Sequence, residues 1–111
     1  MAQEKVSRRD LLTACLTKQA ISRVVIKEVT IPPGGKADYH LHPCPVVGTV
    51  IAGTLLYQLE GKTPEIIEQG EAFYEPRNQP VQHFDNASET EPLVFTAFYL
   101  VEEKEDLITI L

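Results

Sequence analysis

Two of the three histidines in this chain lie two positions apart, as His40 and His42. On an extended strand, residues i and i+2 project to the same face, so both imidazole rings point the same way. Their backbones are then roughly 6 to 7 Å apart, which lets one nitrogen from each ring converge on a single ion. Imidazole is a suitable ligand for Fe(II), Mn, Ni, Cu and Zn. The pair therefore indicates a metal site; the alternative is an exposed strand face that binds nothing.

The elements that must position these histidines are predicted to be strands. The segment 21–31 is β-branched and partly alternating, and the turn-forming run 32–35 (Pro-Pro-Gly-Gly) ends it. Further apolar runs follow at 46–52, 54–59, 81–84 and 92–101, with turn residues between them. Many short strands without an amphipathic helix predict an all-β sandwich or barrel. We expect residues 1–20 to form an N-terminal arm or edge strand and residues 21–111 to form one barrel domain.

The spacing around the histidine pair resembles the first motif of the cupin family. That motif reads Gly, five residues, His-x-His, three or four residues, Glu, six residues and Gly. Here the corresponding positions are Gly34, His40, His42, Val46 and Gly53. Every spacing fits, but Val46 stands where the family has a glutamate that is normally a metal ligand.

The second cupin motif is matched less well. Gly70 and Pro76 fit its beginning, but strict counting puts Val81 at the position of its histidine and Asp85 at that of its asparagine. The only later histidine is His83, two residues further on. Two extra loop residues would bring His83 into place; without them it keeps the same face but lies about 6.6 Å further along the strand. The resemblance spans residues 21–101.

The resemblance implies a double-stranded β-helix, or jelly-roll barrel, with His40 and His42 facing inward and a metal near one mouth. The expected ligands are His40, His42 and His83, holding one divalent transition metal (Fe, Mn, Ni, Cu or Zn). Three neutral imidazoles leave the ion its full charge, which favours an anionic ligand such as a carboxylate or thiolate. The alternative is that His40 and His42 line a dry or water-filled pocket.

Two functions follow from this resemblance. The first is a mononuclear non-haem metal enzyme, similar to a dioxygenase, that acts on a small organic molecule. The second is a non-catalytic cupin that binds a small molecule and has a lost or incomplete metal site. The sequence contains no Ser-His-Asp or Cys-His nucleophile set, no paired-carboxylate site and no phosphate-binding glycine loop. No catalytic residue other than the metal ligands is therefore predicted.

Composition narrows the range of partners. Sixteen acidic residues against ten basic ones give a formal charge of −6, which disfavours binding to nucleic acid or to an anionic membrane surface. No stretch of about 18 apolar residues exists to span a bilayer. A chain of 111 residues buries roughly two thirds of its unfolded surface, so we expect a homodimer interface to add stability.

The cysteines and the N-terminal residues indicate the cellular compartment in which the protein is expected. Cys15 and Cys44 are too few for a disulfide framework, which favours a reducing cytoplasm. The segment 7–12 (Ser-Arg-Arg-Asp-Leu-Leu) resembles a twin-arginine export signal, which is the alternative. The apolar run after the arginines is short, however, and no Ala-x-Ala cleavage site follows it. We therefore expect a cytoplasmic protein.

Overall fold

The computed structural model describes residues 5–111, and this part of the chain contains nine β-strands and no helix. The strands are β1 (Arg23–Ile31), β2 (His40–Leu41), β3 (Val46–Ala52), β4 (Thr54–Leu59), β5 (Glu65–Glu68), β6 (Ala72–Glu75), β7 (Val81–Asn86), β8 (Leu93–Val101) and β9 (Thr109–Ile110). The prediction of an all-β fold is confirmed. Among residues 5–111, no helix has the length and apolar character needed to cross a membrane.

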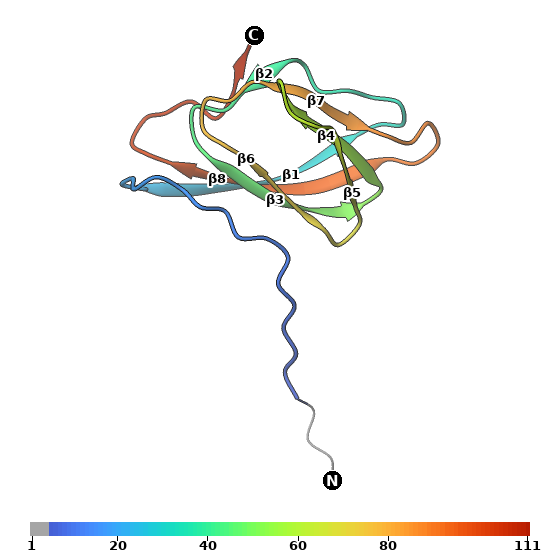
Figure 1. Ribbon diagram of the computed structural model, residues 1–111, viewed down its shortest axis with the longest axis horizontal. Coiled ribbons are helices and arrows are strands. Elements are labelled where there is room, and N and C mark those ends of the chain that lie inside the picture. The colour runs from blue at the N-terminus through green and yellow to red at the C-terminus, as the bar shows by residue number, and fades with distance from the viewer. Residues whose placement is uncertain (1–4) are drawn as a thin grey trace.

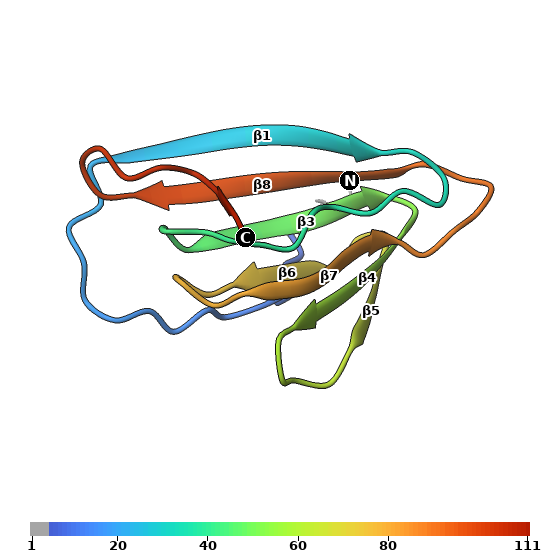
Figure 2. The ribbon, with the colours of Figure 1, turned by 90° about the horizontal axis from the view of Figure 1, so that it is seen from above.

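The strands form two antiparallel sheets that face each other. One has the order β1-β8-β3-β6 and the other β5-β4-β7-β2-β9. In Figure 2 the long strands β1, β8 and β3 lie side by side, while the hairpin of β4 and β5 diverges from them. Because all neighbouring strands except β4 and β5 are separated in sequence by other strands, the turns alone cannot define the fold. The core must bring the sheets together.

Burial alternates along the strands as a two-sheet core requires. Along β8 every second residue from Leu93 to Val101 is buried. Four aromatic rings fill the centre of the core, with neighbouring centroids 4.9 to 6.5 Å apart: Tyr57, Phe73, Phe84 and Phe95. Phe98 has the opposite parity on β8 and lies on the outer face of the first sheet, so it is not part of this cluster.

The strand β2 is short and lies between two partners from later in the chain. His40 pairs with Val81 of β7 and with Ile110 of β9, and Leu41 pairs with Thr109. Just beyond these strands, the Leu111 amide donates to the Tyr39 carbonyl at 3.0 Å. The segment that carries the histidine pair is therefore held on one side by residues about 70 positions away from it.

Residues 5–22 precede β1 and form neither helix nor strand. Figure 1 shows this extended arm passing along the two sheets first, with its N-terminal part then running away from them. Where the arm passes the first sheet, Leu11 and Leu12 line a shallow groove with Val47 and Phe98 on the outer face. Arg9 donates to the Gly70 carbonyl at 3.4 Å.

Candidate metal centre

His40 and His42 come together inside the molecule with a carboxylate that the sequence analysis did not select. Both rings are 4% exposed, their centroids lie 4.9 Å apart, and Glu75 of β6 is 3% exposed beside them. Nε2 of His42 lies 2.5 Å from Oε2 of Glu75, and Nε2 of His40 lies 3.9 Å from Oε1. One ligand atom from each residue falls within 4.8 Å of the others. Two donors on one ion are about 3 to 4 Å apart at ordinary metal–ligand distances, so this group fits a metal ion.

Backbone carbonyls orient both imidazoles. Nδ1 of His40 lies 2.6 Å from the Asp38 carbonyl, and Nδ1 of His42 lies 2.6 Å from the Leu107 carbonyl. A carbonyl oxygen only accepts, so each Nδ1 must carry the proton. In the neutral ring Nε2 then holds a lone pair, and both Nε2 atoms point toward Glu75. This is the arrangement by which proteins prepare histidines to bind metals.

Without an ion, a proton must join His42 to Glu75, because a lone pair and a carboxylate oxygen repel each other at 2.5 Å. Burial alone lowers the pKa of His42, but the hydrogen bond and charge of Glu75, helped by the Leu107 carbonyl, outweigh burial and raise it. A divalent cation in place of this proton would satisfy the same three groups. The pair is thus suited to exchange a proton for a metal.

Glu75 lies directly opposite Val46 in the ladder between β3 and β6. Both side chains face inward, and Val46 is 1% exposed. The carboxylate missing from Val46 in the first motif is therefore present on the neighbouring strand. The alternation of β6 contains the signal that was missed: Phe73 and Glu75 share a face, so a buried strand carries a carboxylate into the core.

The structure does not bring His83 to the other two histidines. The register of β4 and β7 shifts between Gln58 and Leu59, so two steps on β7, from Val81 to His83, match a single step on β4. This extra residue breaks the two-residue period and turns His83 to the outer face, opposite Gln58. There Nδ1 of His83 lies 3.0 Å from Oδ2 of Asp85. On a regular strand, as predicted from the sequence, His83 would have kept the inward parity of Val81.

The remaining neighbours of the site are mostly apolar. Val81 pairs with His40 and is 1% exposed, so β7 offers no ligand where the family motif has a histidine. The ring of Tyr99 packs edge-on against His42 at 5.7 Å. Tyr57 is buried, and its hydroxyl donates to the Tyr74 carbonyl at 2.6 Å. Cys44 is fully buried, and this burial is the main reason that its pKa is raised. Its sulfur does not belong to the group of ligand atoms.

The family model for the cupin domain matches residues 27–99, which is more than half of the chain. The chain belongs to the cupin family. No curated protein sequence matches this cupin significantly.

Solved structures agree with the fold of this cupin. A cupin-like protein from Thermotoga maritima superposes with a TM-score of 0.68 at 25% identity, over 79% of this chain and 64% of the other. Oxalate oxidase in complex with the substrate analogue glycolate gives a TM-score of 0.67 at 23% identity, over 78% of this chain and 45% of the other. The DMSP lyase DddQ from Ruegeria pomeroyi gives a TM-score of 0.67 at 20% identity, over 78% of this chain and 42% of the other. The predicted double-stranded β-helix is confirmed, and this cupin spans less than half the length of the oxalate oxidase and lyase chains.

Proposed function

We propose that this cupin holds one divalent transition metal through His40, His42 and Glu75, and that the bound metal contacts a small organic ligand. The observation that carries the proposal is the convergence of two Nε2 atoms, each opposite a protonated Nδ1, on one buried carboxylate. A buried group of this kind is costly unless it is paired or bound to an ion. The proposed set replaces His83 of the sequence prediction with Glu75.

The donor set favours particular metals. Two histidines and one carboxylate, with other coordination positions left open, are typical of non-haem Fe(II) sites, while imidazole and carboxylate also suit Mn, Ni, Cu and Zn. One carboxylate reduces the charge of the bound ion from +2 to +1. An anionic ligand is therefore still favoured, although less than at a site of three neutral histidines.

Within this proposal, catalysis by the metal is the first candidate activity, and binding without chemistry is the second. The metal would supply Lewis acidity or redox chemistry to a small organic molecule. A groove along β5 and β6 reaches the residues on either side of Glu75 and offers a place for a small ligand, although His40, His42 and Glu75 do not themselves line it. It is lined by Tyr57 and Phe73 of the core, by Tyr74 and Pro76 on either side of Glu75, and by Arg9 of the arm.

The proposed partner in assembly is a second copy of the chain, in the cytoplasm. The outer face of the sheet β1-β8-β3-β6 is largely apolar, although outer faces of antiparallel sheets are usually polar. Its outward-facing residues include Val24, Ile26, Val47, Ile51, Val94, Phe98 and Leu100. The strands β1, β8, β3 and β6 contain 9, 9, 7 and 4 residues, so at about 3.4 Å per residue and about 4.8 Å between strands they give a face of roughly 470 Å². This face, with the arm added, would supply a large part of the ~800 Å² per partner of a stable interface.

Metal binding is tested by elemental analysis of protein purified without added metal, followed by titration with Fe(II), Mn, Ni and Zn under anaerobic conditions. We expect one ion per chain, and we expect His42→Ala and Glu75→Gln to abolish binding. His83→Ala is the matched control, because His83 lies on the outer face and its removal should leave the stoichiometry unchanged. Loss of binding in His83→Ala alone would contradict the proposed ligand set.

The two activities are separated by oxygen consumption with the loaded protein and a panel of small thiols, diketones, aromatic diols and carboxylates. Turnover that disappears in His42→Ala would establish the enzyme. Ligand binding detected calorimetrically without turnover would favour the binding function.

The homodimer is tested by light scattering coupled to size-exclusion chromatography. Ile26→Glu places a charge on the apolar outer face and should give monomers, whereas Thr30→Glu near the end of the same strand is the control. A monomeric wild-type chain would contradict the dimer.

A further inference from the structure

The segment that carries His42 has little regular structure of its own. Strand β2 contains two residues, and within residues 5–111 its ladder partners are one residue of β7 and two of β9. His42 itself lies just beyond β2, at the start of the loop that leads to β3. Its burial and its 2.5 Å contact with Glu75 nevertheless require a fixed ring position. Contacts from outside the sheet must therefore hold the ring of His42 in place.

The carbonyl that orients His42 comes from a segment that also lacks regular structure. Leu107 lies between β8 and β9, six residues after the end of β8. Within that connection, the Glu105 amide donates to the Glu102 carbonyl at 3.1 Å, and the Glu102 amide donates back to Oε1 of Glu105 at 2.8 Å. This reciprocal pair makes a compact turn immediately before Leu107.

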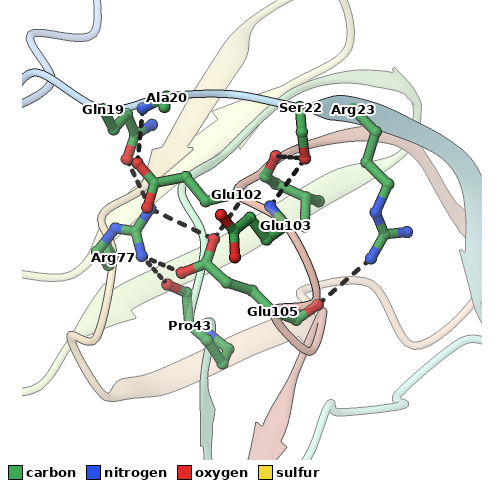
Figure 3. Close-up of polar contacts among 10 residues, drawn as sticks. Gln19, Ala20, Ser22, Arg23, Pro43, Arg77, Glu102, Glu103 and Glu105 are labelled. Carbon is green, nitrogen blue, oxygen red and sulfur yellow. Dashed lines mark hydrogen bonds and ion pairs between the residues drawn. The ribbon is translucent and has the colours of Figure 1, made fainter.

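Arg77 joins this turn to the loop after His42, as Figure 3 shows. Its Nη1 donates to the Pro43 carbonyl at 2.8 Å and also bonds Oε2 of Glu105. Its Nη2 donates to Oε1 of Gln19 at 2.6 Å and to Oε1 of Glu105 at 3.4 Å. Pro43 is the residue after His42, and Arg77 is two residues after Glu75. The guanidinium of Arg77 therefore contacts the loop after His42 and the turn before Leu107. Arg77 also follows Glu75 closely in sequence, so it connects all three segments that build the site.

The backbone reinforces the same connection. The Asn78 amide donates to the His42 carbonyl at 2.8 Å, so the residue after Arg77 holds the main chain of His42 directly. Asn78 has a positive φ of 60°, so the chain turns sharply just after this hydrogen bond. The side chain of Arg77 and the main chain of Asn78 thus both donate hydrogen bonds to the His42–Pro43 segment.

We propose that Arg77 is a positioning residue for the metal centre. It clamps the 102–107 turn onto the His42–Pro43 segment, so that the Leu107 carbonyl holds the imidazole of His42 with Nε2 directed at Glu75. This inference rests on the proposed metal-binding function for its purpose, although the clamp can be measured without metal. Arg77 touches none of the ligand atoms and acts only through its partners.

Arginine suits this position better than lysine. Its planar guanidinium offers five donors in a fixed arrangement and can bond a carboxylate and a carbonyl at the same time. The side chain is 27% exposed and that of Glu105 is 21% exposed, so the pair is partly shielded from solvent. A lysine could reach Glu105 or Pro43, but its single ammonium would hold the two segments less rigidly.

The test compares three full-length variants with the wild type: Arg77→Ala, Arg77→Lys and the control Arg23→Ala. Arg23 donates to the Glu105 carbonyl at 3.4 Å, so its removal perturbs the same turn without touching Pro43. Removing the outer partners of metal-binding histidines typically weakens metal affinity about 10- to 100-fold. We expect a loss of at least about ten-fold in Arg77→Ala, a smaller loss in Arg77→Lys, and less than about two-fold in Arg23→Ala.

A second readout needs no metal. In protein labelled with ¹⁵N, the Nδ1 proton of His42 should exchange slowly with water in the wild type and in Arg23→Ala, and quickly in Arg77→Ala. A wild type that binds no metal but keeps this protected proton would contradict the proposed function and leave the clamp standing. If Arg77→Ala is too unstable to purify, Arg77→Lys carries the same comparison. Unchanged affinity and unchanged proton protection in the Arg77 variants would overturn the inference.

Discussion

Val46 and Glu75 face each other across the β3–β6 ladder, and both side chains point into the core. The cupin motif has a carboxylate on the first of these strands, and this chain carries its carboxylate on the second. Directly opposed residues in an antiparallel pair have Cβ atoms about 4.5 to 5.5 Å apart. A glutamate side chain is long enough to serve one site from either position.

This relationship predicts that the carboxylate can be moved back. Glu75→Val should abolish metal binding, and the double variant Val46→Glu/Glu75→Val should restore it, because β3 then returns the charge to the same region from the opposite side of the ladder. Titration with Ni or Zn followed calorimetrically measures both. Failure of the double variant to bind, while it remains folded by circular dichroism, would show that the position of Glu75 cannot be replaced.

A second prediction concerns Gly48, which lies on the inward face of β3. A Cβ atom at this position would lie 2.0 Å from the Thr96 carbonyl oxygen and 2.4 Å from Cζ of Phe73. The space that a glycine leaves here is therefore already filled by the core. We expect Gly48→Ala to lower the free energy of unfolding by about 3 kcal/mol or more, since overpacking displaces both neighbours.

The control for this prediction is Gly61→Ala. A Cβ there would meet nothing within 4 Å, although φ is +77°, so only backbone strain of about 1 kcal/mol is expected. Urea unfolding of both variants measures the difference. Equal losses in the two variants would mean that the packing around Gly48 adjusts freely.

The pH dependence of the Arg77–Glu105 pair forms a third prediction. Burial alone raises the pKa of Glu105, but the backbone hydrogen bond at Glu102 and the hydrogen bond and charge of Arg77 outweigh burial and lower it. A carboxyl whose folded pKa is below its unfolded value stabilises the fold above the unfolded value of 4.5, and this stabilisation is lost as pH falls through the folded pKa.

Glu105→Gln removes the titrating group and serves as the reference. Urea midpoints of metal-free wild type and variant, measured from pH 3 to pH 7, should differ by a constant amount above about pH 5 and converge at the acid end. A difference that does not change over this range would show that the charge of Glu105 contributes nothing.

The two cysteines should react differently with thiol reagents. Cys15 on the arm is exposed, whereas Cys44 is fully buried and burial raises its pKa. Only the thiolate reacts quickly, so one thiol per native chain should be titrated and two after denaturation. In Cys15→Ser the rapid reaction should disappear. Rapid modification of native Cys15→Ser would contradict the burial of Cys44.

The sequence was sufficient to predict the fold and two of the three proposed ligands, His40 and His42, with their shared orientation. The two-residue period of a strand places His40 and His42 on one face whatever the surrounding contacts are. Glycine and proline turns fix where the strands end. Both signals are local, so a single sequence contains them.

The positions of Glu75 and His83 relative to the site could not be predicted from local sequence patterns. The role of Glu75 arises from the pairing of β6 with β3, and the outward turn of His83 arises from one extra residue in the pairing of β7 with β4. Neither pairing register can be predicted from the residues of one strand alone. The Leu107 carbonyl is a backbone group, and no pattern of side chains could have identified it as the partner of His42.

The depth of the ligand atoms has a consequence for how the protein acquires its metal. With exposures of 3 to 4%, His40, His42 and Glu75 are out of reach of a hydrated ion, and of the small organic ligand proposed for the metal, until part of the fold opens. Entry and escape would then be limited by the frequency of local opening rather than by diffusion. Occupancy would record the metals available when the chain folded, so protein produced in media with different trace metals should differ in content and equilibrate only slowly.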